Sequence, residues 1–457
     1  MPDPSQHAFL AGVIEGFYGP PWTSAEREEL LVGMARWGLN AYLYAPKDDL
    51  KHRAAWREPY APEETAALAS LIGGCRERGI RFVYALSPGL DMRYGDPGEH
   101  QRISARFEQV LALGCDDFAL LFDDIPDRMR EEDRRRWPTF AAAQCFAANQ
   151  AFAWVRARRP AARFLFCPTP YCGRMAARGF GGADYLDVTG RDLSPEIDVF
   201  WTGPEIIARE ISASHLRELR TRLRRPPVIW DNLHANDYDG RRFYCGPYAG
   251  RPPELRSEAS GILCNPNTEF PLNFVPLRTF AAYLQADASW DPRGAYRQAI
   301  VEWLPRFATL GGDASAEELT LLGDCFYLPY EEGAEAESLC RALERLLARP
   351  PAAWVDDDVA AFLEPAQRLR DFCARLADLR DRRLFAALHR RTWELREELD
   401  LLLGYVRAQR RDPQTPFRSD FHQPGTYRGG MAVRLQRALA LSSDGVFRPS
   451  IGGAANP

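Results

Sequence analysis

The stretch Ala-Leu-Leu-Phe-Asp-Asp-Ile at residues 119–125 is an apolar run that ends in two adjacent carboxylates. An unpaired charge is expensive to bury, so Asp123 and Asp124 must lie where water or a ligand can solvate them. This pattern indicates a buried strand whose last residues reach the mouth of a site. We therefore expect the rest of the chain to be organised around this strand and its acidic end.

Seven other short apolar runs accompany it in the first 285 residues, and helical patterns with apolar residues three and four apart separate them. The eight runs are residues 13–17, 41–45, 81–86, 118–122, 163–167, 198–201, 228–230 and 261–264. The helical stretches include residues 24–37, 62–78, 101–113, 140–156 and 204–223, and Thr23 with Glu26 fits a capping box before the first of them.

Eight strand-plus-helix units in this length predict an α/β fold, a closed (β/α)8 TIM-type barrel. An open doubly wound sheet is the structural alternative, but the first strand is followed by Gly-Phe-Tyr-Gly at residues 16–19, which is not a Gly-rich phosphate turn. From about residue 290 to residue 410 helical periodicity dominates. We predict a barrel at 1–287, an all-α helical bundle domain at 288–411, and a partly disordered tail at 412–457 with a helical patch near 432–441.

Composition excludes several classes of partner. The formal net charge of −5 is mild for 457 residues, which argues against nucleic acid and anionic membrane surfaces as partners. No window approaches a membrane-spanning apolar run, and the first residues lack the pattern of a signal peptide, so we expect a cytoplasmic protein. Ten cysteines are scattered without a CxxC pair, which favours reduced core thiols over a zinc site.

Only two of the 58 basic residues are lysines, Lys47 and Lys51. A compact ammonium that sits among several acceptors cannot be replaced by a planar guanidinium without cost. Lys47 follows the second predicted strand and is therefore a candidate site residue, whereas Lys51 fits a surface loop.

Active sites of such barrels lie at the carboxyl ends of the strands, so the residues that follow each strand are informative. Acidic, amide and aromatic residues gather there: residues 15–19, 46–49, 123–124, 168–171, 201–204, 230–239 and 265–267. Aromatic faces suit a sugar ring, amides and carboxylates suit its hydroxyls, and a carboxyl pair suits acid and base chemistry. The predicted barrel thus carries the side chains of a sugar site at one end.

Five of these segments resemble glycoside hydrolase family 84, the O-GlcNAcases and related β-N-acetylglucosaminidases. They are Glu-Gly-Phe-Tyr-Gly-Pro-Pro-Trp at 15–22, Tyr-Ala-Pro-Lys-Asp-Asp at 44–49, Leu-Phe-Asp-Asp-Ile at 121–125, Trp-Thr-Gly-Pro at 201–204, and Trp-Asp-Asn at 230–232 with Asn-Asp-Tyr at 236–238. The resemblance covers roughly residues 10 to 285 in order and weakens in the helical part.

The resemblance implies a retaining hydrolase assisted by its substrate, without a metal or cofactor. Asp123 would hold the N–H of the sugar's 2-acetamido group, whose carbonyl oxygen attacks the anomeric carbon to form an oxazoline. Asp124 would protonate the leaving oxygen and then deprotonate the attacking water. Adjacent carboxyl groups push each other's pKa values apart, which is consistent with one ionised and one protonated member.

A regular strand raises a geometric objection, because successive side chains point to opposite faces. Both carboxyl groups can reach one ligand only if the strand ends or bulges at Asp123. We therefore predict an irregularity at this point.

The resemblance also implies binding roles for residues after the other strands. Sugar hydroxyls would be bound by the Gly16 backbone, Lys47, Asp237 and Asn265; Asn232 would bind the acetamido group or Asp123; Tyr171 and Trp230 would wall the N-acetyl methyl group. Pro170 before Tyr171 departs from the expected acidic residue. Asp48 and Asp49 are interpreted as acceptors that order their loop.

The implied substrates are GlcNAc-bearing glycoproteins, glycopeptides or small aryl glycosides. GlcNAc-terminated oligosaccharides or cell-wall fragments remain an alternative, as does a catalytically silent sugar-binding protein, against which the two aspartates argue. A metal-dependent hydrolase is a further alternative, prompted by His234 near Asp231 and Asp237. The sequence leaves a homodimer open.

Overall fold

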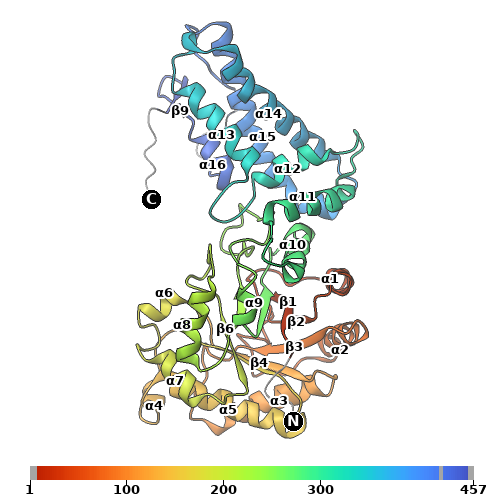
Figure 1. The fold of residues 1–457 in the computed structure, drawn as a ribbon, viewed down its shortest axis with the longest axis vertical. Helices are drawn as coiled ribbons and strands as arrows, with labels where there is room; N and C mark the ends of the chain where they lie inside the picture. The colour runs from red at the N-terminus through yellow and green to blue at the C-terminus, as the bar shows by residue number, and fades with distance from the viewer. Residues whose placement is uncertain (1–7, 421, 423–425, 451–457) are drawn as a thin grey trace. The chain divides into compact units, whose positions relative to one another are not determined.

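The computed structural model describes residues 8–420, 422 and 426–450 (Figure 1). Its first part is a closed barrel of parallel strands in chain order. The strands are β1 (Leu10–Glu15), β2 (Ala41–Tyr44), β3 (Arg81–Leu86), β4 (Asp117–Leu121), β5 (Phe164–Cys167), β6 (Ile197–Trp201), β7 (Val228–Asp231) and β8 (Gly261–Cys264). Strand β8 closes on β1, with Leu10 opposite Gly261 and Val13 opposite Cys264. The predicted (β/α)8 barrel is confirmed.

The helices that connect these strands surround the barrel in Figure 1. They are α1 (Ser24–Trp37), α2 (Pro62–Glu77), α3 (Pro97–Leu111), α4 (Glu131–Arg134), α5 (Phe140–Arg158), α6 (Gly173–Ala177), α7 (Tyr185–Asp192), α8 (Ala213–Leu223) and α9 (Leu255–Glu258). The capping box of α1 is confirmed, since Thr23 Oγ1 accepts the Glu26 N–H at 3.3 Å and Glu26 Oε2 accepts the Thr23 N–H at 2.8 Å.

The helix predicted at 204–223 is wrong in its first part, because α8 begins only at Ala213, after the N-cap Ser212. Backbone carbonyls before this cap are bound by side chains instead of by a helical ladder. Asn232 Nδ2 donates to the carbonyl of residue 206 at 2.9 Å, and Arg251 donates to the carbonyls of residues 208 and 209, each at 2.9 Å. The segment before Ser212 is therefore a loop fixed by residues that follow β7.

The described residues divide into two compact units. The first holds the residues up to Tyr238 together with 248–270 and 280–291, and the second holds 239–247, 271–279 and those from Pro292 on. After η1 (Phe270–Leu272) and α10 (Phe274–Gln285), the later elements are α11 (Pro292–Trp303), η2 (Leu304–Phe307), α12 (Ala316–Asp324), α13 (Ala334–Leu347), η3 (Pro351–Ala353), α14 (Asp356–Arg375), η4 (Leu376–Asp378) and α15 (Arg382–Arg411). The second unit is mainly helical, as expected for this part of the chain.

The segment after α15 differs from the prediction. The helical patch predicted near 432–441 is a helix only at α16 (Gly430–Gln436), and β9 (Leu439–Leu441) then pairs antiparallel with β10 (Phe447–Pro449). Leu439 and Phe447 are buried in the core of the second unit, which stabilises this small sheet. The end of the predicted tail, 451–457, lies outside the described residues.

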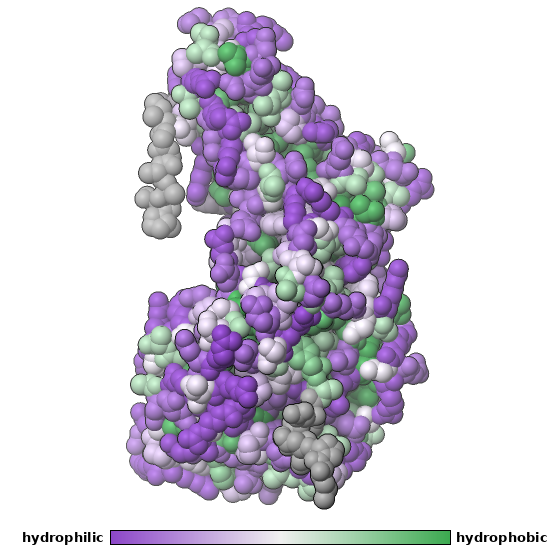
Figure 2. Space-filling view, viewed as in Figure 1, coloured by the Kyte–Doolittle hydropathy of each residue, from purple (hydrophilic) through white to green (hydrophobic). Residues whose placement is uncertain are grey.

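All ten cysteines are buried and free, which confirms the prediction of reduced core thiols. The face in Figure 2 is mostly hydrophilic, with hydrophobic residues in small scattered groups. None of the described helices combines the length and apolar character needed to span a membrane.

Candidate active site

Strand β4 ends at Leu121, two residues before the first carboxylate. Phe122 still continues the strand pairing, since its N–H donates to the Cys167 carbonyl at 3.0 Å. Asp124 then has a φ of +50°, in the left-handed region that is uncommon for residues with a side chain. This turn breaks the alternation of the strand, so both carboxyl groups can face one mouth. The predicted irregularity is present.

Asp123 is buried, with 6% of its surface exposed. Its Oδ2 forms an ion pair with the Lys47 ammonium, and its Oδ1 has no hydrogen-bond partner within the described part of the chain. Burial alone would raise the pKa of Asp123, but the charges of Lys47 and Arg53 outweigh it and hold the pKa below its usual value. Asp123 is thus an ionised carboxylate with one acceptor oxygen left for a ligand.

Asp124 is exposed and is held by two tyrosine hydroxyls. Tyr171, after β5, donates to Asp124 Oδ1 at 2.7 Å, and Tyr18, after β1, donates to Oδ2 at 3.1 Å. Burial and the charge of Asp124 raise the pKa of both hydroxyls, so both are neutral donors. The two carboxyl groups therefore have unlike surroundings: Asp123 is paired with a buried cation, and Asp124 accepts hydrogen bonds from two neutral hydroxyls.

Trp230, near the end of β7, forms a wall of the same site. Its ring packs edge-on against Phe200 with centroids 5.4 Å apart, and the Lys47 ammonium lies 5.4 Å from the Trp230 ring centroid. A Cβ at Gly16 would lie 2.5 Å from Cζ2 of Trp230 and 2.6 Å from Cγ2 of Ile14. Gly16 is therefore required by the close approach of the tryptophan ring to the backbone.

Gly16→Ala is expected to displace Trp230, because backbone and ring cannot both stay in place. We expect a destabilisation of about 1 to 3 kcal/mol from overpacking and a fall in kcat/KM of about tenfold or more from the shifted wall. Thermal unfolding measures the first effect, and steady-state kinetics on the aryl glycoside that the sequence resemblance implies as substrate measure the second. Gly73→Ala in α2 is the matched control, since a Cβ there meets nothing within 4 Å. Equal behaviour of the two variants would contradict the role of Gly16.

The amide and acid residues after β7 and β8 form a second group. Asn265 Nδ2 donates to Asn232 Oδ1 at 3.0 Å, while the buried Asn265 Oδ1 accepts no hydrogen bond from the residues described. Asn232 also donates to the carbonyl of Ile206 at 2.9 Å. Asp237 Oδ2 accepts the Tyr18 N–H at 2.9 Å, and burial raises the pKa of Asp237.

Asp48 and Asp49 order loops, as the sequence indicated. Asp48 Oδ2 accepts the Gly19 N–H at 3.0 Å and so ties the loop after β2 to the loop after β1. Asp49 Oδ2 accepts the hydroxyls of Tyr44 and Tyr60, each at 2.8 Å. In the part of the chain that the structure describes, neither Asp48 nor Asp49 forms a hydrogen bond with Asp123 or Asp124.

The metal-dependent alternative does not fit the donors around His234. Asp231 Oδ1 accepts from Arg251 Nη2 at 2.7 Å, and Oδ2 accepts from Tyr248 at 2.6 Å and from Arg251 Nε at 2.8 Å. Both carboxylate oxygens are thus already bound to neighbours in a fully buried ion pair. Among the described residues, no group of three or more His, Cys, Asp or Glu side chains is arranged to hold a metal ion.

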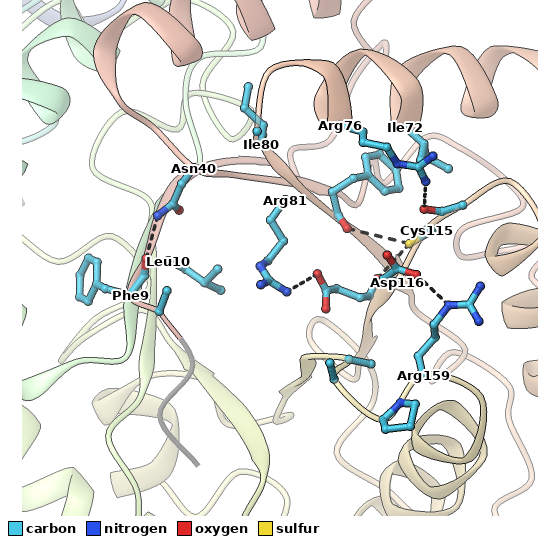
Figure 3. A pocket seen from close by; sticks show the side chains of 18 residues that line it. Phe9, Leu10, Asn40, Ile72, Arg76, Ile80, Arg81, Cys115, Asp116 and Arg159 are labelled. Carbon is cyan, nitrogen blue, oxygen red and sulfur yellow. Dashed lines mark hydrogen bonds and ion pairs between the residues drawn. The ribbon is translucent and has the colours of Figure 1, made fainter. Parts of the chain in front are cut away.

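A hollow of about 810 Å³ lies at the opposite, amino ends of the strands (Figure 3). Its charged side chains are already paired: Arg81 with Asp117 at 2.6 Å, Arg159 with Asp116 at 2.8 Å, and Arg76 with the Gly114 carbonyl at 2.6 Å. Side chains paired in this way offer a ligand few free donors or acceptors. The candidate site is therefore the mouth around Asp123 and Asp124.

Sequence reasoning missed two residues of this mouth. Tyr18 binds Asp124 with its hydroxyl and Asp237 with its N–H, and Arg53 binds the carbonyls of the aspartate pair. Tyr18 lies in the segment 15–22 after the first predicted strand, and its hydroxyl, as a possible donor to Asp124, is the signal that could have identified it. Arg53 gave no comparable signal among the many arginines of the chain.

Comparison with known proteins agrees with this geometry. The sequence model of the beta-N-acetylglucosaminidase family matches residues 11–319. The Protein O-GlcNAcases of Rattus norvegicus and Mus musculus are each 44% identical over 335 residues, which cover 65% of this chain and 36% of each relative. The chain thus spans about a third of the length of these two relatives.

Among solved structures, a mutant of the Thermobaculum terrenum O-GlcNAc hydrolase superposes with a TM-score of 0.77 and 30% sequence identity, over 87% of this chain and 84% of that one. The family match extends over more than half of the chain and contains every residue of the mouth described above. The chain therefore belongs to the beta-N-acetylglucosaminidase family.

Proposed function

We propose that this chain is a retaining β-N-acetylglucosaminidase of the O-GlcNAcase type. It hydrolyses terminal β-linked GlcNAc by substrate-assisted catalysis through an oxazoline intermediate. The observation that carries the proposal is the unlike surroundings of two adjacent carboxyl groups at one barrel mouth. Asp123 is buried against Lys47 with Oδ1 free, and Asp124 is exposed between two tyrosine hydroxyls.

In the first step, the free Oδ1 of Asp123 accepts the acetamido N–H of the sugar. This interaction directs the acetamido oxygen at the anomeric carbon and opposes the positive charge that develops on the ring being formed. Asp124 gives its proton to the glycosidic oxygen as the bond to the anomeric carbon breaks. The products of this step are the free alcohol or phenol and the oxazoline, which is still protonated on nitrogen and hydrogen-bonded through that N–H to Asp123.

In the second step, Asp124 as a carboxylate takes a proton from water while the water oxygen attacks the anomeric carbon. The oxazoline opens, the acetamido group is restored and the β configuration is retained after two inversions. Lys47, Asp237, Asn265 and the Gly16 backbone are the proposed groups for the sugar hydroxyls. Asn232 is the proposed partner of the acetamido group, and Tyr171 and Trp230 are the proposed walls around its methyl. The free Asn265 Oδ1 supports this, because a buried acceptor without a donor suits a sugar hydroxyl.

Turnover of an aryl β-N-acetylglucosaminide by the full chain tests the proposal. We expect the β anomer of GlcNAc as first product, observed by NMR before it equilibrates. Fluorine atoms on the N-acetyl methyl withdraw electrons from the acetamido oxygen, so each added fluorine is expected to slow kcat/KM further. A first product with α configuration, or rates independent of the fluorines, would contradict substrate assistance.

The natural substrate follows from the same proposal. The names of the rat and mouse relatives support GlcNAc on Ser or Thr of glycoproteins over cell-wall fragments. Competition between a Ser-linked GlcNAc peptide and a GlcNAc-terminated cell-wall saccharide in one reaction distinguishes the two. The cytoplasmic location and the homodimer stay predictions, and light scattering on the purified chain tests the latter.

A further inference from the structure

The turn at the end of β4 takes the backbone carbonyls of Asp123 and Asp124 out of the strand pairing, so both need donors from elsewhere. The carbonyl of Phe122 is bound by the Thr169 hydroxyl at 2.9 Å, and beyond it the chain departs from the strand. A buried carbonyl without a donor costs free energy, and a left-handed residue with a side chain adds strain. The conformation of Asp123 and Asp124 must therefore be held from outside the strand.

One guanidinium group supplies both donors. Arg53 Nη2 donates to the Asp124 carbonyl at 2.7 Å, and Nη1 donates to the Asp123 carbonyl at 3.4 Å and to the Ser87 hydroxyl at 3.1 Å. The planar fork matches two neighbouring carbonyls in a way that an ammonium group cannot. Arg53 is itself buried, with 6% of its surface exposed.

The segment that carries Arg53 is fixed to the end of β3. The Ser87 N–H donates to the His52 carbonyl at 2.9 Å, and His52 Nδ1 lies 2.8 Å from the Ala85 carbonyl. The backbone that carries Arg53 is thus held in place at the end of β3, and its guanidinium group extends to the end of β4. Within the described ranges, no carboxylate forms an ion pair with Arg53, and the charge of Arg53 acts on the buried Asp123 carboxylate.

We propose that Arg53 is a positioning residue for the hydrolase reaction: its fork fixes the turn that sets Asp124 beside Asp123, and its charge faces the buried Asp123 carboxylate. This inference rests on the proposed function and deepens it. Arg53 touches neither substrate nor reacting atoms and acts through the two aspartates.

The charge has a consequence for pH dependence. Besides Arg53, the titratable groups around Asp123 are Lys47, His52, Tyr18, Asp124, Cys167 and Tyr171. Burial and the charge of Lys47 lower the pKa of His52 to about 4, so His52 adds no positive charge near neutrality. Lys47 and Arg53 are then the two cations that lower the pKa of Asp123, and loss of either raises it.

Arg53→Met and Arg53→Lys in the full chain separate the two roles. Arg53→Met loses fork and charge, so we expect kcat to fall about hundredfold from misplacement, and the acidic limb of the pH profile of kcat/KM to move to higher pH. Arg53→Lys keeps the charge and loses the fork. We therefore expect a smaller fall in kcat and an acidic limb of the kcat/KM profile at the same pH as in the wild type.

The matched control is Arg225→Met. Arg225 is also buried and also donates to carbonyls, those of Leu223 at 3.0 Å and Ile197 at 2.8 Å, at the amino ends of the strands. We expect a lower Tm with wild-type kcat and pH profile. Wild-type kcat and pH profile in Arg53→Met, or the same shifted limb in Arg225→Met, would overturn the inference.

A measurement without turnover keeps the inference separate from the proposed function. Thermal unfolding of the wild type, Arg53→Met, Asp123→Asn and the double variant forms a double-mutant cycle. We expect the double variant to lose less Tm than the sum of the single losses, whereas the pair of Arg53→Met with Asp116→Asn should be additive. Additive Tm losses for Arg53→Met and Asp123→Asn would overturn the positioning role of Arg53, whether or not the wild type hydrolyses an aryl glycoside. A wild type that hydrolyses no aryl glycoside would refute only the proposed function.

Discussion

Asp123→Asn is expected to lower kcat on a 4-nitrophenyl β-N-acetylglucosaminide by about a thousandfold, the upper range for loss of one preorganised electrostatic group. Asparagine keeps the size of the side chain but removes the negative charge that opposes the developing oxazolinium. It also leaves the Lys47 ammonium buried beside a neutral amide, where the ion pair stood. Because Asp123 acts on ring closure, we expect the loss to be similar for good and poor leaving groups.

Asp116→Asn is the control for this variant. Asp116 precedes the same strand at its other end and forms an exposed ion pair with Arg159 at 2.8 Å, which contributes little to stability. We expect wild-type kinetics from it. Activity of Asp123→Asn within a few-fold of the wild type would show that the acetamido group is directed by something other than this carboxylate.

Asp124→Asn is expected to have an effect that depends on the leaving group. For a Ser-linked sugar, whose alkoxide is a poor leaving group, we expect kcat/KM to fall by about ten-thousandfold, the upper range for loss of a general acid. A 4-nitrophenolate needs little protonation, so the fall should be far smaller. We compare kcat/KM because it reports the steps up to the first bond cleavage.

Asparagine is a clean replacement at this position, since it tolerates the left-handed backbone of Asp124. Unchanged Tm and unchanged far-UV circular dichroism would confirm that fold and turn are intact. Losses of equal size on the nitrophenyl and the Ser-linked substrates would contradict the assignment of Asp124 as the acid. Comparing the losses of Asp123→Asn and Asp124→Asn on the same two substrates is the sharpest test of the different roles of the two aspartates.

The fold was largely predictable because buried parallel strands appear in the sequence as short apolar runs. The predicted bounds of β3 and β8 are those of the structure, and the other strands differ by a few residues. The short helices α4 and α6 have four and five residues, too few to show a helical period. The loop before α8 was mistaken for helix because its hydrogen bonds go to Asn232 and Arg251, which lie far along the chain.

The residues of the site were predictable from the sequence, but the contacts between them were not. A barrel brings the carboxyl ends of all strands to one mouth, so residues that follow the strands meet whatever their separation in sequence. Which of them touch depends on loop conformations that residue types do not specify. Tyr18 donates to the Asp124 side chain, and Arg53 donates to the carbonyls of Asp123 and Asp124. Both contacts depend on the positive φ of Asp124, which the pattern of apolar residues in the strand does not predict.

The left-handed backbone at Asp124 also limits how this protein can change by mutation. Glycine, asparagine and aspartate are among the residues that occupy such a conformation most readily, and a β-branched residue there would strain the turn. A descendant of this chain that lost its activity but kept its fold would therefore be expected to carry asparagine or glycine at this position. Inactive sugar-binding relatives can be sought by that substitution in the Asp-Asp pair.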